Sequence, residues 1–343
     1  MDSPKQTALK AFKREKTEYV PVGVFLGGSW PIINSGLTLE GLIGDYEKTA
    51  RTLYEVNEKL NEDILIVGTG STALLIKALG GDVRFDSKGA PQIISELIKN
   101  EEDLNNLNPD EAISNKSIKW LVDISKKLVE ITYDRRLILA SGRAPFTLAA
   151  QIYGLQNFLK AIYKNPVFAH ELLEFTTKLS LSYFKTMIND GLSHGAFIAD
   201  PSASGDVISK KHYEKFALPY LKKVVDGIKE LDKPVMLHIC GDITDRLDLV
   251  ASSGIDSLSI DTKVDLGKAL EIAGDKISIA GNVDPVDILE FGTQEEVYEA
   301  TVSCLKKGAC KRGFILFPGC DPAGGVPLKN IKTFVDTAHS WIF

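Results

Sequence analysis

The sequence predicts an α/β protein folded as a (β/α)8 barrel (TIM barrel), with extra helices and loops in its N-terminal part. Eight short apolar runs recur along the 343 residues, and long amphipathic stretches separate them. The apolar residues within each run are continuous rather than alternating, which is typical of strands buried on both faces of a parallel sheet. Periodicity does not show closure, so an open sheet of eight strands is the structural alternative.

Each expected strand is rich in Val, Ile, Leu or Phe, and most end in Gly, Pro, Asp or Asn. In chain order the runs are VPVGVFL (20–26), DILIVG (63–68), LILASG (137–142), AFIADP (196–201), PVMLHI (234–239), SLSID (257–261), ISIAGNV (277–283) and FILFPGC (314–320). The long gap at 69–136 leaves room for the extra helices and loops. No repeat or linker interrupts the pattern, so we expect one domain over residues 1–343.

The segments between the strands have the period of amphipathic helices. From Pro166 to Asn189, apolar side chains recur at steps of three and four. Asn165 supplies an N-cap, a proline fits the first turn, and Gly191 stands where a C-terminal glycine is common. A second helix is expected from about Lys210 to Leu231, with a kink or break at Pro219.

The composition excludes several classes of protein. Four cysteines in 343 residues cannot form a disulfide scaffold, and the net charge of −6 argues against a general nucleic-acid binder. The first residues lack the apolar region of a secretory signal, and no run approaches the roughly 18 residues that span a bilayer. The glycines match no GxxxxGK[ST], GxGxxG or GxSxG motif. We therefore expect a cytoplasmic protein without a membrane or nucleic-acid partner.

Three soft ligands lie where a barrel builds its active site, at the C-terminal ends of the strands. His238 and Cys240 end the fifth run two residues apart, which places both side chains on one strand face, about 7 Å apart at Cα. Cys320 ends the eighth run at the same end of the barrel. One imidazole and two thiolates suit Zn²⁺ and leave a fourth position free, as in catalytic zinc sites. Ordinary core packing of small apolar cysteines is the alternative.

The other cysteines and histidines are expected to be structural. Cys304 falls in a helix over 295–307, and Cys310 lies near its end. The remaining histidines are expected to pack in helices or lie at the surface, except for one that precedes the fourth strand at the opposite end of the barrel; they are His170, His212, His339 and, before the strand, His194.

Five segments resemble a known family: DPSASGDVIS (200–209), FALPYLKKVVDGIKE (216–230), LHICGDIT (237–244), GNVDPV (281–286) and FPGCDP (317–322). They resemble the uroporphyrinogen decarboxylase superfamily of (β/α)8 barrels, and more narrowly its zinc-dependent branch, the methylcobamide:coenzyme M methyltransferases. The His-x-Cys…Cys zinc motif of that branch falls on His238, Cys240 and Cys320. The resemblance is strong from about Ala140 onward and weak before it.

The superfamily that the sequence resembles also includes a second activity, the decarboxylation of porphyrinogens. Those enzymes carry an N-terminal Arg-rich signature that binds the carboxylates of the substrate. The corresponding segment here, VFLGGSWPI (24–32), contains no arginine. A tetrapyrrole with eight carboxylates is difficult to hold without such cations, so we do not expect a uroporphyrinogen decarboxylase.

The resemblance implies methyl transfer between a methyl-corrinoid (methylcobalamin or a corrinoid on a corrinoid protein) and a thiol such as coenzyme M. Zinc would convert the thiol, whose free pKa is about 8.5 or above, into the attacking thiolate. A same-branch enzyme that demethylates methanol, a methylamine or an aryl methyl ether onto Co(I) is a second hypothesis, because Trp30 and the Gly68–Gly70 loop belong to a divergent N-terminal third. A non-catalytic zinc- or corrinoid-protein-binding barrel is a third.

Five further polar residues follow the expected strands and are candidates for the site. Asp200 and Asp261, at the ends of neighbouring strands, are candidates for the fourth zinc position or for orienting His238, and we name them as catalytic. Asn282 and Asp284 are candidates for the pocket lining, although capping and turn roles are equally consistent with these types. Arg143 is a candidate for binding a sulfonate or carboxylate tail, with a surface ion pair as the alternative. Oligomeric state is left open.

Overall fold

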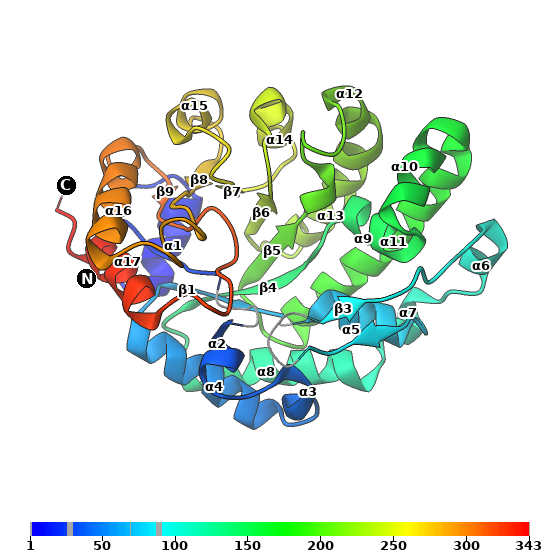
Figure 1. Ribbon diagram of the computed structural model, residues 1–343, viewed down its shortest axis with the longest axis horizontal. Coiled ribbons are helices and arrows are strands. Elements are labelled where there is room, and N and C mark those ends of the chain that lie inside the picture. Colours follow the sequence, from blue (N-terminus) through cyan, green and yellow to red (C-terminus); the bar gives the residue numbers. More distant parts are fainter. Residues whose placement is uncertain (1, 26–29, 69, 87–90, 343) are drawn as a thin grey trace.

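Figure 1 shows the protein, a computed structural model, as a group of central strands within an outer ring of helices. The structure describes residues 2–25, 30–68, 70–86 and 91–342. Seven strands form one parallel sheet in the order β1-β4-β5-β6-β7-β8-β9. Their bounds are β1 (Ile64–Val67), β4 (Leu137–Arg143), β5 (Gly195–Ala199), β6 (Val235–Ile239), β7 (Ser257–Ile260), β8 (Ser278–Ala280) and β9 (Phe314–Ile315).

Two residues of the expected first strand close the sheet into a barrel. Val22 bridges to Leu316 beyond β9, and Gly23 bridges to Ile64 of β1, both in parallel orientation. The Gly23 amide donates to the Leu316 carbonyl over 3.1 Å. These bridges confirm the barrel and exclude the open sheet.

The first strand is shorter than the apolar run 20–26 predicts. Its extended part ends at Phe25, whose φ of 58° lies in the left-handed region. Carboxylates replace part of the missing strand ladder, because the amides of Val22 and Val24 donate to Asp63 over 2.9 Å and to Glu62 over 3.0 Å.

The long gap between the second and third expected strands holds extra elements, as predicted. It contains α5 (Ser71–Ala78), α6 (Glu101–Asn105), α7 (Pro109–Ile113) and α8 (Lys116–Ile131). A short antiparallel hairpin of β2 (Val83–Arg84) and β3 (Gln92–Ile93), which we did not predict, also lies there. Before β1 the chain forms α1 (Pro4–Phe12), α2 (Trp30–Asn34), α3 (Leu39–Leu42) and α4 (Tyr46–Leu60).

The helix expected at 166–189 is α11 (Pro166–Asn189), with its predicted N-cap. The Asn165 side chain accepts from the Phe168 amide over 3.3 Å. Beyond its C-terminal end the left-handed residue is Leu192, with φ of 60°, rather than Gly191. The two shorter helices before it are α9 (Pro145–Tyr153) and α10 (Leu155–Lys164).

The predicted break at Pro219 is also confirmed. After α12 (Lys210–His212) the backbone widens into a π-helix at Tyr213–Ala217, and α13 (Leu218–Lys229) follows. Proline has no N–H and its ring crowds the preceding turn, which explains why the widening lies just before Pro219.

The remaining outer helices are α14 (Leu247–Ala251), α15 (Leu266–Ile272), α16 (Gln294–Gly308) and α17 (Leu328–His339). A separate apolar cluster fills the barrel itself and includes Ile66, Leu139, Met236 and Ile315. Ala8 and Ala11 of α1 belong to this cluster, so α1 packs against one end of the barrel and leaves the C-terminal end to the site. None of the helices in the described ranges is long and apolar enough to cross a bilayer.

Candidate metal centre

The C-terminal end of β6 places two of the predicted ligands. Side chains alternate along a strand, so His238 points to the same side as Met236, which belongs to the cluster inside the barrel. His238 is buried, with 3% of its surface exposed. Cys240 continues the alternation one residue beyond the strand, and Cys320 reaches the same place from the loop after β9.

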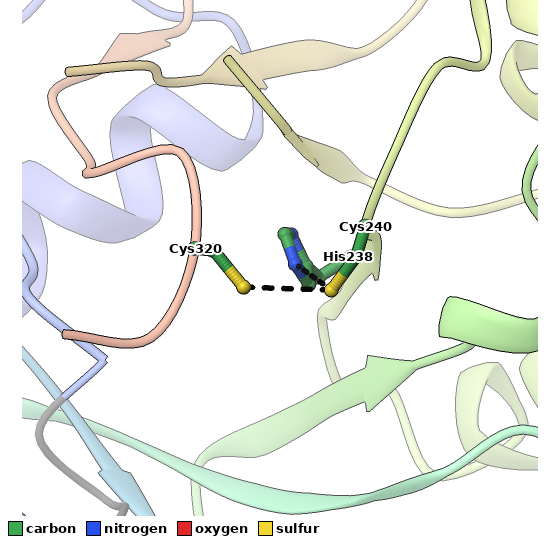
Figure 2. Close-up of side chains that lie close together, drawn as sticks. All are labelled: His238, Cys240 and Cys320. Carbon is green, nitrogen blue, oxygen red and sulfur yellow. Dashed lines mark hydrogen bonds between the residues drawn. The ribbon is translucent and has the colours of Figure 1, made fainter. Parts of the chain in front are cut away.

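The three predicted ligands converge in space (Figure 2). The Nε2 atom of His238 lies 3.0 Å from the Sγ atom of Cys240, and the two sulfur atoms lie 3.5 Å apart. All three ligand atoms lie within 4.8 Å of one another. The sulfur separation exceeds the roughly 2.05 Å of a disulfide, so both cysteines are free.

This donor set fits zinc. Tetrahedral zinc with Zn–S bonds of about 2.3 Å and Zn–N bonds of about 2.0 Å places neighbouring ligand atoms roughly 3.5 to 3.8 Å apart. The observed separations approach this range, so the residues require only small movements to surround an ion. His238, Cys240 and Cys320 would supply three ligands and leave a fourth position for a substrate.

The His238 ring is held by the neighbouring strand and by aromatic side chains. Its Nδ1 atom lies 3.1 Å from the Ser259 hydroxyl and 3.3 Å from the Ser259 carbonyl. Phe25 meets the ring edge-on at a centroid distance of 5.0 Å, and Phe197 stacks on it at 6.2 Å. Nδ1 can donate its proton to the Ser259 carbonyl, which leaves the Nε2 lone pair free for a metal.

The two thiols have different proton affinities. A hydrogen bond with Cys320, together with burial, raises the pKa of the Cys240 thiol. The same hydrogen bond and the nearby His238 lower the pKa of the Cys320 thiol. The two sulfur atoms therefore titrate as a coupled pair. Two such sulfurs close together disfavour a second negative charge, and a divalent cation would remove this repulsion.

A cavity of about 240 Å³ opens beside the three ligands. Its apolar wall includes Phe25, Ile66 and Phe197. Its volume is below the roughly 300 to 1,000 Å³ of pockets for drug-sized ligands, so it suits a small molecule.

Arg143 lies in this cavity wall, where β4 ends. Its Nε atom is buried and has no hydrogen-bond partner among the described residues. The surface ion pair that we considered for Arg143 is not formed with any acidic residue in the described ranges. Arg143 is therefore a cation in the cavity wall that forms no direct ion pair with a described residue, although its charge lowers the pKa values of Asp321 and Asp200.

Asp321 is a cavity residue that sequence reasoning did not select. It follows Cys320 directly, so its position in the chain was the available signal. The side chain is exposed toward the cavity, and the surrounding protein raises its pKa above that of a free aspartate. Negative charge on Cys320 adds to the increase, and Arg143 opposes it.

Asp200 lies outside the group of three ligands. It is fully buried after β5, where its Oδ1 atom accepts from the Thr147 amide over 3.1 Å and from the Thr147 hydroxyl over 2.6 Å. Burial raises its pKa to about 7, and its Oδ2 atom has no partner in the described part of the chain. Its amide donates to the His238 carbonyl over 2.8 Å, so its contact with His238 is through the backbone.

Asp261 supports the turn that carries Cys240. Its Oδ2 atom accepts from the Gly241 amide over 2.8 Å, and its Oδ1 atom accepts from the Lys263 amide over 3.0 Å. We expected Asp200 and Asp261 on neighbouring strands, but they follow β5 and β7, and β6 lies between them. A catalytic role for either aspartate stays a prediction.

Asn282 and Asp284 make local contacts with the backbone. The Asn282 amide group donates to the carbonyls of Asp261 over 3.0 Å and Val264 over 2.8 Å. Asp284 accepts from the amides of Val286 and Asp287, both over 2.8 Å. Neither is among the described residues that line the cavity, so their binding role also stays a prediction.

The remaining cysteines and histidines lie where the pattern placed them. Cys304 is half-buried in α16 and Cys310 is exposed beyond its end. The histidines contact neighbouring side chains or loops: His170 with Tyr220, His194 with Asp134, His212 with Ser209 and His339 with Asp63.

The divergent N-terminal third reaches the site in two places. Trp30 is buried, and its indole N–H donates to the Val326 carbonyl over 2.9 Å in the loop that also carries Cys320. Gly68 and Gly70 line the cavity. Residues 26–29 and Thr69 lie outside the described residues.

A comparison with family models matches residues 3–341 to Uroporphyrinogen decarboxylase (URO-D). The chain belongs to the URO-D family. Because the match begins at residue 3, it extends over the N-terminal part in which the resemblance had looked weak. The URO-D family thus covers every element of the barrel described above.

Among curated relatives of this URO-D member are two proteins named methylcobamide:CoM methyltransferase MtbA. The one from Methanosarcina acetivorans is 35% identical over 75% of this chain and 73% of its own length. The one from Methanosarcina mazei is 30% identical over 99% and 98%. A uroporphyrinogen decarboxylase from Prochlorococcus marinus is 33% identical over 74% and 72%.

A solved structure of a methyltransferase from Methanosarcina mazei has the same fold. It superposes with a TM-score of 0.90 over 99% of both chains, at 22% identity. The two MtbA relatives confirm the branch of the URO-D family that the His-x-Cys…Cys motif predicted.

Proposed function

We propose that this URO-D family member is a zinc-dependent methyltransferase that moves a methyl group between a methyl-corrinoid, carried on a corrinoid protein, and a small thiol such as coenzyme M. The observation that carries the proposal is the convergence of His238, Cys240 and Cys320 beside a small cavity at the C-terminal end of the barrel. The names of the MtbA relatives support the corrinoid and the thiol.

Bound zinc would supply a Lewis acid that lowers the pKa of the substrate thiol and holds it as a thiolate at neutral pH. The chain's own residues prepare for this. His238 offers the Nε2 lone pair because Ser259 receives the Nδ1 proton. Cys240 and Cys320 each contribute one negative charge, which together balance a divalent cation and keep the substrate sulfur electron-rich.

The cavity determines which thiol fits. Phe25 and Phe197 exclude water from the side of His238, which keeps a sulfur anion poorly solvated and reactive. Arg143 lines the same space and has no direct ion pair with a described residue, so it is suited to the anionic tail of the thiol. A short thiol that carries a sulfonate or carboxylate satisfies both requirements, whereas methanol and methylamine have no group for Arg143.

The reaction itself requires only the thiolate and the corrinoid. The sulfur donates an electron pair to the methyl carbon, so a sulfur–carbon bond forms as the cobalt–carbon bond breaks. The electron pair of the broken bond remains on cobalt, which leaves as Co(I). Since the cavity of about 240 Å³ is filled by a small thiol, the corrinoid must approach from its open side.

The geometry does not favour porphyrinogen decarboxylation, despite relatives of that name. Arg143 is the single cationic side chain among the described residues that line the cavity. One cation is a poor match for eight carboxylates, and the cavity is small for a tetrapyrrole.

A turnover assay with methylcobalamin and a panel of thiols tests the proposal. The panel contains coenzyme M, an alkyl thiol with a carboxylate and an uncharged alkyl thiol. We expect zinc-dependent loss of the methylcobalamin absorbance, fastest with the anionic thiols. A zinc-loaded protein that shows no methyl transfer to any of them would contradict the proposal.

A further inference from the structure

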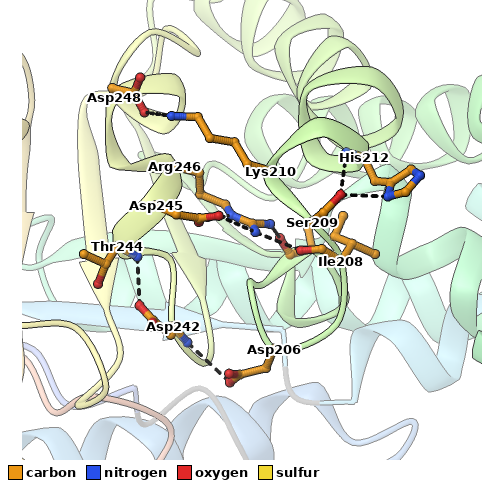
Figure 3. Close-up of polar contacts among 11 residues, drawn as sticks. Asp206, Ile208, Ser209, Lys210, His212, Asp242, Thr244, Asp245, Arg246 and Asp248 are labelled. Atoms are coloured by element: carbon orange, nitrogen blue, oxygen red, sulfur yellow. Dashed lines mark hydrogen bonds and ion pairs between the residues drawn. The ribbon is translucent and has the colours of Figure 1, made fainter.

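A buried arginine joins two of the loops that surround the metal centre (Figure 3). Arg246 lies in the loop after β6, and its side chain is completely buried. Its Nη1 atom donates to the Ala203 carbonyl over 2.9 Å, and its Nη2 atom donates to the Ile208 carbonyl over 2.8 Å. Both carbonyls belong to the loop after β5, so one guanidinium holds the two loops together.

The orientation of this guanidinium is fixed on its other sides. Asp245 accepts from Nε over 2.7 Å and from Nη2 over 3.2 Å, and the ring of Tyr213 lies 5.3 Å from its central carbon. A planar guanidinium with donors on both edges satisfies all these contacts in one orientation, so it fixes the relative position of the two loops that it binds. Burying a charge has a desolvation cost, and the contacts with Asp245, the two carbonyls and Tyr213 offset it only in this one arrangement.

The loop that Arg246 holds is the one that begins at Cys240. Within it, the Asp242 carbonyl accepts from the Gly205 amide over 2.7 Å, which continues the contact between the two loops. A Cβ atom at Gly205 would lie 2.5 Å from that carbonyl, so the backbones touch here. Gly241, between Cys240 and Asp242, has φ of 87° and forms the tight turn.

We propose that Arg246 is a positioning residue for the metal centre: by fixing the loop over residues 240–246 against the loop over 203–208, it sets the direction of the Cys240 thiol. The inference rests on the proposed zinc site. His238 lies within the β6 ladder and needs no such support, whereas Cys240 is the first residue beyond the strand. The direction of its sulfur therefore depends on the following loop, which Asp261 also supports through the Gly241 amide.

Zinc affinity and the spectrum of the Co²⁺-substituted protein test this inference. The variants are Arg246→Met, which removes the donors, and Arg246→Lys, which keeps the charge. Residues that orient metal ligands typically contribute about 10- to 100-fold to metal affinity. We therefore expect the zinc dissociation constant of Arg246→Met to be at least roughly tenfold larger than that of wild type. We also expect a shifted cobalt–thiolate band, and a smaller loss for Arg246→Lys.

The matched control is Asn330→Ala, which also removes a buried side chain that donates to two loop carbonyls, those of Leu289 and Gly292. It contacts the loops after β8 and not those after β5 and β6, so we expect unchanged zinc affinity. Equal losses in Asn330→Ala and Arg246→Met would overturn the inference, since they would indicate general loosening.

A second variant keeps the test decisive if Arg246→Met does not fold. Gly205→Ala pushes the same two loops apart at their backbone contact, and we expect it to weaken zinc binding in the same way. If Arg246→Met folds, wild-type zinc affinity and an unchanged cobalt spectrum in that variant would overturn the positioning role alone. If it does not fold, the same result in Gly205→Ala would overturn it. A wild-type protein that binds no zinc would instead overturn the proposed function, and this inference with it.

Discussion

The Nδ1 atom of His238 lies 3.1 Å from the hydroxyl oxygen of Ser259, and the two residues are register partners on β6 and β7. Each is buried, so neither group exchanges its partner readily with water. The contact fixes the rotation of the imidazole and, through the Ser259 carbonyl, the position of its proton. A residue of β7 thus orients a predicted metal ligand on the neighbouring strand β6.

Ser259→Ala tests this relationship. We expect a loss of zinc affinity of roughly tenfold or more, because the ring loses one of the two partners that orient it. The matched control is Ser257→Ala on the same strand, whose buried hydroxyl bonds to Ser278 and not to His238. Competition with a chromophoric chelator measures both. Equal affinities in the two variants would show that the Ser259 hydroxyl does not orient His238.

Cys320→Ala removes the ligand that comes from the loop after β9. We expect loss of stoichiometric zinc and of methyl transfer, because one thiolate and one imidazole bind zinc far more weakly than the complete set. Cys304→Ala is the control, since Cys304 is half-buried in α16 and outside the group. Metal analysis after gel filtration provides the measurement. Full zinc content and full turnover in Cys320→Ala would rule out the proposed centre.

Arg143→Ala tests the anchor for the substrate tail. A hydrogen bond to a charged group contributes about 1.5 to 3 kcal/mol, so we expect KM for coenzyme M to rise by roughly 10- to 150-fold. KM for an uncharged alkyl thiol should change little, because it has no tail for the guanidinium. Steady-state kinetics with both thiols, and with exposed Arg51→Ala as control, separate the cases. An unchanged KM for coenzyme M would contradict the anchoring role.

Glu62→Gln tests the carboxylate that supports the first strand. Burial raises the pKa of Glu62 to about 8, from 4.5 when it is unconstrained. Between these values the folded protein holds a proton that the unfolded chain has released, so the free energy of unfolding falls as pH rises. Glutamine keeps an acceptor for the Val24 amide without a charge. We therefore expect the variant to gain stability over wild type on the order of a few kcal/mol near pH 8.

Urea unfolding of both proteins at pH 5 and pH 8 measures this difference. The gain from Glu62→Gln should be small at pH 5 and increase toward pH 8. Glu55→Gln, on an exposed position of α4, serves as the control and should show no such trend. A gain that is the same at both pH values would indicate that Glu62 does not titrate as described.

Hydrophobic patterning predicted most of the fold, because buried parallel strands leave continuous apolar runs. It did not show closure, which depends on two bridges at Val22 and Gly23 and on amide contacts with Asp63 and Glu62. Glu62 precedes the second expected strand and Asp63 is its first residue, and nothing in their local pattern identifies an amide of another segment as the partner.

The metal ligands were predictable because spacing and strand ends are both visible in a sequence. The support for His238 was not, since Ser259 lies inside an apolar run and its partner follows from the register of two strands. A polar residue after a strand predicts a place in the site less well than the spacing of the metal ligands does. Asp261 and Asn282 bond to the backbone of loops, and residue type alone does not distinguish such a contact from a place in the cavity.

The two-residue bridge at Val22 and Gly23 has a mechanical consequence. It joins β1 to the segment after β9, and both sides lead to the site. Phe25, which contacts the His238 ring, follows it closely, and Cys320 lies four residues beyond its partner Leu316. A movement of this join would therefore displace both Phe25 and the loop that carries Cys320, and an ion held by His238, Cys240 and Cys320 would tie that loop to β6 across β7 and β8.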